Sequence, residues 1–228
     1  MVEYTAYNGK KIVDAIYAGN NKVFYVYKGT RLVWRLKHYE KGQTIFESST
    51  AGTYSYDVMD DGYYQFIGVG GGGGGASSRS DDTGVGAAGG SGGYSDVNIY
   101  VSRGNYNIVV GGGGSAAITW RSTPAQAGNG GDSVFASASA GGGGGGYAYR
   151  NGGGTHGGAG GTGSTQNGNA GGTSGGGRVN GAASVYGGYG AGGFGSGSDG
   201  INAGAGGAGY VKIVYLGDTI DEELRMRA

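Results

Sequence analysis

The residues that could perform acid–base or metal chemistry are few in this sequence and lie far apart. The chain contains two histidines, His38 and His156, and no cysteine. Neither histidine has a nearby acid in an obvious catalytic or metal-binding constellation. The carboxylate pairs Asp60-Asp61 and Asp81-Asp82 lie in turn-like settings, where turn formation or solvation explains them more simply than catalysis. We therefore expect no enzymatic activity, no catalytic residue, no metal site and no cofactor.

Glycine patterns that could hold a phosphate occur many times, but a glycine-rich chain produces them by chance. The pattern G-x-G-x-x-G indicates a dinucleotide site only between a strand and a helix, with an acidic residue downstream. No helical pattern is visible in the glycine-rich region. Between positions 68 and 209, five arginines balance five aspartates and no lysine is present. Nucleic-acid binding draws on clustered basic residues, so we expect no nucleic-acid partner.

Two short segments combine large aromatic side chains with arginine, a composition that is enriched at binding hot spots. They are Trp120-Arg121 and Tyr147-Ala148-Tyr149-Arg150, and both interrupt glycine runs. Aromatic faces stack on sugars or apolar protein surfaces, and arginine binds carboxylates or phosphates in a two-point geometry. The alternative interpretation is that the aromatics fold back to cover the glycine-rich structure. The candidate receptor-binding residues are Trp120, Arg121, Tyr147, Tyr149, Arg150 and Tyr186.

These candidates must be positioned by an unusual scaffold, because 61 of the 228 residues are glycine. A single proline and the absence of a G-X-Y register exclude collagen. Glycine recurs with period three in patches such as Gly154, Gly157, Gly160 and Gly163. Polyproline II has three residues per turn, so this spacing places glycine along one side, where neighbouring backbones can approach and hydrogen-bond. We predict stacked polyproline II helices over residues 68–209, with disorder of some segments as the alternative.

Strand-like segments enclose and interrupt this region. Residues 53–58 and 63–67 predict a hairpin closed by an Asp-Gly turn, because β-branched and aromatic residues flank Asp60-Asp61-Gly62. Residues 94–101 and 106–110 predict a second hairpin in the same way. A final strand is expected at residues 210–215.

The N-terminal region repeats the pattern Y-x-G-x-x-x-V every ten residues, starting at Tyr7, Tyr17 and Tyr27. Glycine after a polar residue suits tight turns, so the repeat predicts an antiparallel β-meander. Three short strands bury little surface by themselves. We therefore expect this module to bind copies of itself, for example as a homotrimer, or another protein.

Together these patterns predict an all-β and irregular chain, with an N-terminal β-meander followed by a strand-flanked glycine-rich domain of stacked polyproline II helices. We see no secretory signal and no apolar stretch near the roughly 20 residues that span a bilayer, so no membrane insertion is expected. The absence of cysteine fits assembly in a cytoplasm. The predicted segments are a mounting or oligomerisation module at 1–36, a β-hairpin connector at 37–67, the glycine-rich domain at 68–215 and a polar tail at 216–228.

The order of strands and glycine runs, with the phrases "YNIVVGGGG" and "GGAGYVKIVY", resembles glycine-rich bacteriophage tail-fibre proteins. It is also similar to the receptor-binding adhesins at the fibre tips of T-even-like phages. The resemblance covers about residues 52–215 and implies a polyproline II scaffold whose loops contact the host surface. It implies a virion protein assembled in the host cytoplasm, with a protein or glycan receptor as partner. Residues 1–36 would then bind other virion proteins, although their repeat does not match the long attachment region of those adhesins.

Two alternatives stay open at this point. The same domain could serve a purely structural head-fibre, decoration or tail-collar protein of a virion, without recognition. A cellular glycine-rich protein that binds ice or another surface is the second alternative. Ice binding calls for a flat face of regularly spaced Thr or Ala. The threonines at positions 155, 162, 165 and 173 keep no fixed interval.

Overall fold

The computed structural model is all-β, which confirms the predicted class, and its chain divides into two compact units, residues 1–40 and 41–228. Since the described residues contain no helix, none of them forms a helix that is long and apolar enough to cross a membrane. The structure describes residues 2–7, 10–18, 21–23, 25–28, 31–35, 39–79, 84–120, 123–149, 154–175, 178–196 and 203–218.

The first unit contains two small antiparallel sheets among its described residues. β1 (Val2–Tyr7), β2 (Lys10–Ala18) and β3 (Asn21–Val23) form a three-stranded sheet in the order β1-β2-β3. β4 (Tyr25–Lys28) and β5 (Arg31–Arg35) pair as a separate hairpin. The ten-residue repeat therefore corresponds to a meander of three strands followed by a hairpin, and not to one continuous sheet.

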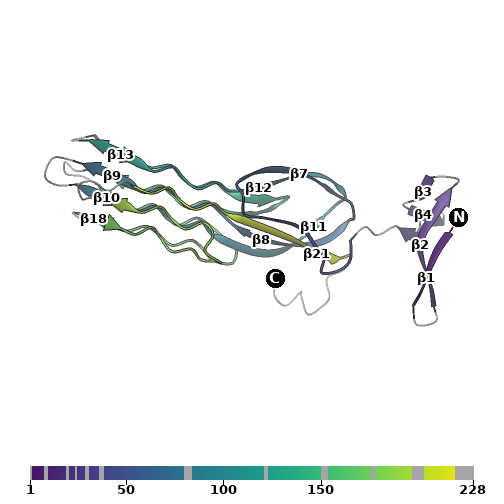
Figure 1. Ribbon diagram of the computed structural model, residues 1–228. Coiled ribbons are helices and arrows are strands. Elements are labelled where there is room, and N and C mark those ends of the chain that lie inside the picture. Colours follow the sequence, from purple (N-terminus) through teal and green to yellow (C-terminus); the bar gives the residue numbers. More distant parts are fainter. Residues whose placement is uncertain are drawn as a thin grey trace. The chain divides into compact units, whose positions relative to one another are not determined.

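At one end of the second unit, two four-stranded sheets pack face to face (Figure 1). The first, called here the β8 sheet, has the order β11-β8-β21-β6, and the second, the β12 sheet, has the order β16-β15-β12-β7. The strands are β6 (Thr44–Ser48), β7 (Gly52–Val58), β8 (Gly62–Val69), β11 (Tyr94–Val101), β12 (Gly104–Val110), β15 (Ser133–Phe135), β16 (Ala138–Ala140) and β21 (Tyr210–Gly217). The expected final strand is β21, which lies between β8 and β6 and pairs antiparallel with both.

An apolar core fills the space between these sheets. Alternate residues of β8 point inward, so Tyr64 and Phe66 are fully buried while their neighbours are half-buried. The Tyr64 ring lies 6.3 Å from the ring of Phe135 on the opposite sheet and 5.1 Å from that of Tyr215 on β21. Burial of large side chains therefore stabilises this sandwich in the ordinary way.

The pairing of the strands corrects the two predicted hairpins. β7 pairs with β12 and β8 pairs with β11, so the chain crosses from one sheet to the other at both expected turns. β8 has β11 on one edge and β21 on the other, which leaves no edge for β7. Gly62 does not complete a turn. It begins β8, where an added Cβ would come 2.7 Å from the carbonyl oxygen of Gly217. The connector at 37–67 is therefore not a hairpin.

Hydrogen bonds to Asp60 and Asp61 hold the first crossing in place and tie it to the second. The buried Tyr64 hydroxyl donates to the carbonyl of Asp60 at 2.6 Å. The Arg103 amide donates to a carboxylate oxygen of Asp61 at 2.7 Å. Asp60 and Asp61 therefore fix the sheet-to-sheet connections, in a structural role.

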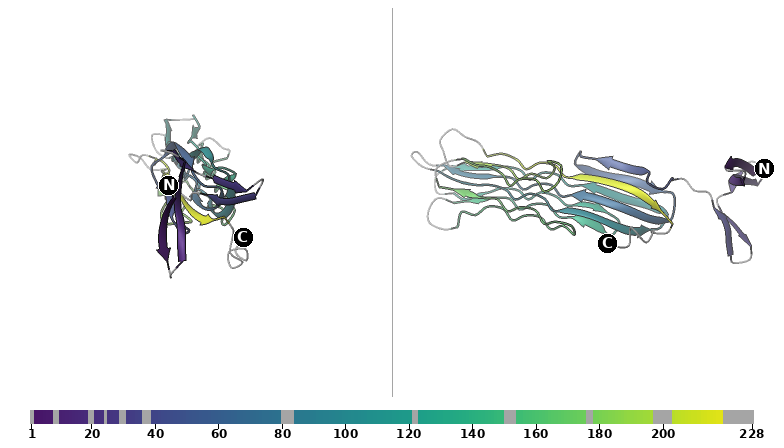
Figure 2. Two further views of the ribbon diagram at one scale, coloured as in Figure 1. Left: turned by 90° about the vertical axis from the view of Figure 1, so that its right-hand side faces the viewer. Right: turned by 90° about the horizontal axis from the view of Figure 1, so that it is seen from below.

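From the sandwich, ten glycine-rich runs extend to the other end of the described second unit, alternately leading away from the sandwich and back (Figures 1 and 2). They are numbered run 1 to run 10 in chain order. Their residues are 70–75, 88–93, 111–116, 127–132, 141–146, 156–162, 167–172, 180–185, 190–194 and 203–209. β8 leads directly into run 1, and run 10 leads directly into β21.

The backbone hydrogen bonds of run 1 have period three. Its amides donate in rotation to runs 2, 4 and 10, with N···O distances between 2.8 and 3.1 Å. The donor–acceptor pairs are Gly70–Gly93, Gly71–Gly131, Gly72–Gly207, Gly73–Gly90, Gly74–Gly128 and Gly75–Gly204. An extended helix with three residues per turn and bonds directed to its neighbours is a polyproline II helix. The hydrogen-bond pattern thus agrees with the predicted stack.

Close packing explains why run 1 consists of six consecutive glycines. The amides of run 1 donate to runs 2, 4 and 10, and its carbonyls accept hydrogen bonds from runs 3, 5 and 9. An added Cβ at any position from Gly70 to Gly75 would overlap a backbone carbonyl of one of those three runs. Run 1 is therefore surrounded on every side by backbone, and no side chain fits.

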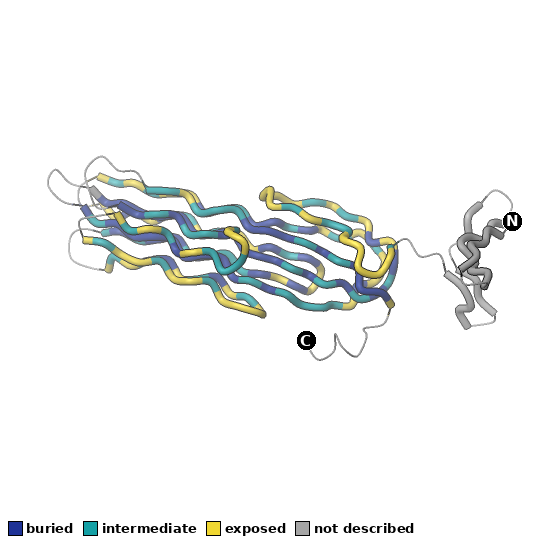
Figure 3. The backbone as a smooth tube through the Cα atoms, turned by 60° about the horizontal axis from the view of Figure 1, so that its bottom comes forward, coloured by how far each residue is buried: buried dark blue, intermediate teal, exposed yellow. Residues whose placement is uncertain are grey.

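Run 2 is the second central element, and its neighbours are runs 1, 5, 6, 7, 8 and 9. Runs 1 and 2 are buried along their whole length, whereas each of the other eight runs contains half-buried or exposed residues (Figure 3). Runs 3 to 10 surround this pair in sequence order. The two central runs therefore come first in the sequence, and the eight runs that follow lie around them.

Ser91 is a residue of run 2 that is not glycine, and its hydroxyl has a specific partner. This hydroxyl accepts a hydrogen bond from the backbone amide of Asn169, in run 7, at 2.8 Å. The Asn169 side chain in turn donates to the carbonyl of Ala183 in run 8 at 3.0 Å. These side chains link runs 7 and 8 through polar bonds, so a buried hydroxyl is tolerated here.

Short strands close the end of the bundle far from the sandwich, called here the distal end. One sheet has the order β13-β9-β10-β18 (Figure 1). Two further pairs are β14-β17 and β19-β20. The strands are β9 (Ala76–Arg79), β10 (Val85–Ala87), β13 (Ala117–Trp120), β14 (Ala125–Gln126), β17 (Tyr147–Ala148), β18 (Thr173–Ser174), β19 (Arg178–Val179) and β20 (Gly195–Ser196).

Candidate binding surface at the distal end

The distal end gathers connections from five different parts of the chain. Runs 1, 3, 5, 7 and 9 all lead away from the sandwich, so the segment after each of them lies at this end. At the opposite ends of the runs, the chain passes through sandwich strands or short turns. The number of runs between two interruptions decides which of them share an end, and the sequence alone left this number open.

Small side chains hold the distal connections together. Ala76, Ala87, Ala125, Ala127 and Ala148 form a buried cluster. The buried Ser77 hydroxyl donates to the carbonyl of Ser196. The Ser78 hydroxyl donates to the carbonyl of Thr123 at 3.3 Å. Closely spaced backbones leave room only for such residues, and the result is a rigid base for the side chains that point outward.

Trp120 is the most prominent of these outward side chains. It ends β13, an outer strand of the distal sheet, and is 61% exposed. Ile118, two residues earlier on the same face of the strand, is 40% exposed. The Thr119 hydroxyl donates to the carbonyl of Thr123 at 2.7 Å, which fixes the end of the connection that follows. Ile118 is not among the contact residues predicted from the sequence, although its two-residue spacing from Trp120 was a signal.

Tyr147 and Tyr149 lie at the same end, but they are half-buried. The Tyr147 ring stacks on that of His156, with centroids 5.1 Å apart, and the backbones of the two residues exchange hydrogen bonds of 2.9 Å. The Tyr149 backbone amide donates to the hydroxyl of Thr155 at 3.1 Å, and this hydroxyl donates to the Tyr149 carbonyl at 3.1 Å. These two tyrosines therefore combine a place at the distal end with a packing role.

Of the other predicted contact residues, the structure describes Tyr186 alone. Arg121 and Arg150 lie outside the described residues. Tyr186 lies at the opposite end of the bundle, in the turn between runs 8 and 9. Its ring stacks on Tyr94 of β11, with centroids 4.5 Å apart and an interplanar angle of 7°.

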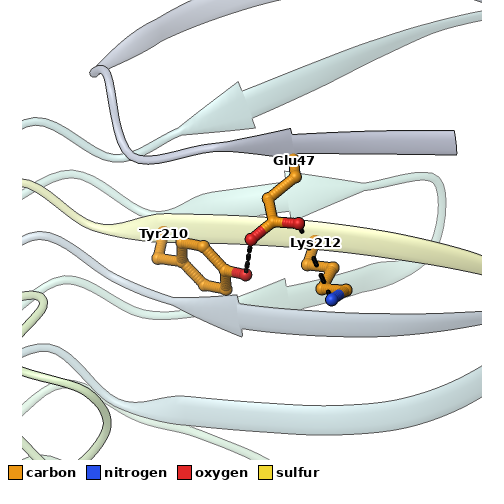
Figure 4. A network of polar contacts seen from close by, with 3 residues as sticks. All are labelled: Glu47, Tyr210 and Lys212. Atoms are coloured by element: carbon orange, nitrogen blue, oxygen red, sulfur yellow. Dashed lines mark hydrogen bonds and ion pairs between the residues drawn. The ribbon is translucent and has the colours of Figure 1, made fainter. Parts of the chain in front are cut away.

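Tyr186 belongs to a cluster of four tyrosines beside the β8 sheet. The Tyr189 ring stacks on Tyr210 of β21 at 4.6 Å, and Tyr186 lies 6.2 Å from Tyr210. Partial burial, and then the negative charge of Asp96, raise the pKa of Tyr94 to about 12. Burial, and then the hydrogen bond from its hydroxyl to Glu47, raise the pKa of Tyr210 (Figure 4).

A charged side chain packs on an aromatic ring at this end of the bundle. The Arg178 guanidinium lies 4.1 Å above the ring of Phe194, a cation–π contact at the base of the distal end. No group of three His, Asp or Glu side chains among the described residues could hold a metal ion. The described part of the distal surface therefore offers aromatic, aliphatic and hydroxyl groups for contact.

An all-β sandwich that extends into a glycine-built bundle defines a structural class of domain. Residues 48–220 match the family model of the glycine-rich domain, and the chain belongs to this family. The match begins at the end of β6 and continues past β21, so it covers the sandwich and the bundle together. No curated protein matches the chain.

Proposed function

We propose that the protein is a structural virion component of a bacteriophage, a fibre or fibre-tip adhesin that binds a receptor on the host-cell surface. The observation that carries this proposal is the distal end, where Trp120 and Ile118 are exposed on a base built from five separate connections. The order of strands and glycine runs supports it, because it resembles phage tail-fibre proteins and fibre-tip adhesins.

The bundle suits recognition because it separates the scaffold from the contact residues. The runs bind one another through backbone groups, so a change in the distal connections leaves the hydrogen bonds between runs in place. A rigid base also lowers the conformational entropy lost on binding. Residues 1–36 would mount the protein on other virion proteins or assemble copies of it, for example as a homotrimer, and assembly would take place in the host cytoplasm.

Binding of the labelled protein to the bacterial strain in which the particle grows tests this proposal. Truncation of a central aromatic anchor typically costs about 2 kcal/mol or more. We therefore expect Trp120→Ala to bind cells at least roughly thirtyfold more weakly than the parent. The matched control is Met59→Ala, because Met59 is 44% exposed and follows β7 in the sandwich.

Circular dichroism of both variants shows whether they fold. A folded Trp120→Ala protein that binds cells like the parent would refute the distal assignment. Electron microscopy with gold-labelled antibody locates the protein on the particle. A position on the head or collar, together with cells that do not bind the parent protein, would favour the purely structural alternative.

A further inference from the structure

The outer faces of the two sandwich sheets differ in composition. On the β12 sheet, the outward residues are small and polar, and Ser55, Asn105 and Asn107 are all exposed. On the β8 sheet, the residues that alternate with the buried Tyr64 and Phe66 include Tyr63, Gln65 and Ile67, and these are half-buried. The first face is typical of a solvated surface, whereas the second presents aromatic, amide and aliphatic groups together.

Polar side chains in the middle of the β8 sheet's outer face are held by one another. The Gln65 side-chain amide donates to Asp96 at 2.7 Å, and the Tyr94 hydroxyl donates to the other oxygen of Asp96 at 3.4 Å. On β21 and β6, Glu47 accepts from the Tyr210 hydroxyl at 2.7 Å and lies 3.6 Å from the Lys212 ammonium (Figure 4). Each carboxylate keeps further lone pairs for an external donor.

Gln65, Asp96, Glu47 and Lys212 are called here the polar strip, and aromatic rings lie at both of its ends. Tyr63 and Tyr100 are directly opposite each other on β8 and β11, with ring centroids 5.4 Å apart, and Tyr100 is 57% exposed. At the other end are Tyr94 and the stacked ring of Tyr186. Tyr94 and Tyr100 are six positions apart on β11, which corresponds to about 20 Å of strand.

We propose that the outer face of the β8 sheet is a second binding surface, which takes a neutral oligosaccharide. An extended chain of sugar rings can lie along the strip, with an apolar ring face against Tyr100. Its hydroxyl groups can donate to Glu47 and Asp96 and accept from Gln65 and Lys212. Because these side chains already hold one another in place, less conformational entropy is lost when such a ligand binds.

Charge selects this ligand over an anionic one or a second copy of the chain. Three charged groups take part in these contacts. Two are carboxylates, of Glu47 and Asp96, and one is the ammonium of Lys212. An acidic polysaccharide would be repelled by the excess negative charge. A two-fold pair of copies meeting through this face would bring the same carboxylates towards one another, and the polar strip interrupts the apolar contact that such a pair needs.

This surface is independent of the proposed receptor contacts, because it lies on the sandwich and not at the distal end. Binding of the full-length protein to an array of neutral and acidic oligosaccharides, followed by titration of the retained sugars, tests it. We expect neutral sugars to bind and Tyr100→Ala to weaken them at least tenfold. Gln65→Ala is expected to weaken them as well. Asn107→Ala, on the opposite sheet, and Trp120→Ala are the controls and should bind like the parent.

Hydroxyl-radical footprinting of the parent protein supplies a readout that needs no variant. A bound neutral sugar should protect Tyr63 and Tyr100 and leave Trp120 unchanged. The proposal is wrong if no neutral sugar is retained, if only acidic sugars bind, or if Trp120→Ala alone abolishes binding. Loss of cell binding in Trp120→Ala with sugar binding intact would separate this surface from the distal one. A dimer whose contact protects Tyr100 in the absence of sugar would also overturn the proposal of a sugar-binding surface.

Discussion

The sandwich and the bundle of the second unit are ordered by different parts of the polypeptide. In the sandwich, large side chains such as Phe66 and Phe135 fill the space between the sheets. In the bundle, runs 1 and 2 are buried with almost no side chains, and backbone amides and carbonyls make the contacts. The hydrophobic effect therefore stabilises one region, and hydrogen bonds with close backbone packing stabilise the other.

This difference indicates that the bundle depends on the sandwich. A hydrogen bond contributes about 0.5–1.5 kcal/mol net, whereas fixing a residue's backbone costs about 1–2 kcal/mol, and glycine loses the most freedom. The bundle is thus close to balance by itself. The sandwich strands β8, β11, β12, β15, β16 and β21 each continue into a run, so the sandwich fixes where those runs begin or end.

The largest expected effect comes from the sandwich core. Phe66→Ala removes a fully buried ring from β8, and such truncations cost about 3–5 kcal/mol. If the sandwich fixes the register of the runs, this variant lowers the stability of both regions together. Urea unfolding, followed by tyrosine fluorescence for the sandwich and amide exchange for the glycines, measures both. Glycine amides that stay fully protected while the sandwich unfolds would contradict the dependence.

A smaller effect, confined to the bundle, is expected for Gly73→Ala. The added methyl group would overlap the carbonyl of Gly144, and backbone on every side leaves it little room to move. Overpacking costs about 1–3 kcal/mol, and we expect the upper end of that range. Amide exchange should show loss of protection in the runs around run 1, while the sandwich strands keep theirs.

Gly112→Ala is the matched control for this variant. Its added Cβ would have only the Ala51 methyl within reach, at 3.7 Å, and its φ is not in the left-handed region. We expect unchanged or slightly increased stability, by about 0.4–1 kcal/mol, because alanine restricts the unfolded chain. Equal destabilisation by the two substitutions would show that glycine is needed for a reason other than close packing.

The same contrast explains what the sequence could predict. The period-three spacing is local: Gly71 and Gly74 both donate to run 4 because each turn of the helix returns to the same neighbour. Strand positions are local too, and those expected around the glycine-rich region are present. Their pairing is not local, since β8 finds β21 about 140 positions later and then has no free edge for β7.

The candidate contact residues follow the same rule. The residue types alone singled out Trp120, and the structure places it, exposed, at the distal end. Tyr186 has a similar sequence setting but lies at the other end, because the direction of each run depends on how many runs precede it. That number emerges only when the hydrogen bonds between the runs are known.

The smallest expected effect lies at the junction of the two regions, where Tyr186 stacks on Tyr94. The pKa of Tyr94 is raised from 10 to about 12, so the folded protein holds this proton more tightly than the unfolded chain. Its contribution to stability is complete below pH 10 and is lost as the pH rises towards 12. Tyr94→Phe keeps the ring stack and removes the titrating group. Thermal unfolding of the variant should therefore depend less on pH than that of the parent between pH 10 and 12, with the two alike in slope below pH 10.

Tyr63→Phe is the control, because Tyr63 lies on the same sheet at the opposite end of β8. Identical alkaline slopes for the parent and Tyr94→Phe would show that the junction does not hold the proton, and that the two regions meet through ring stacking alone.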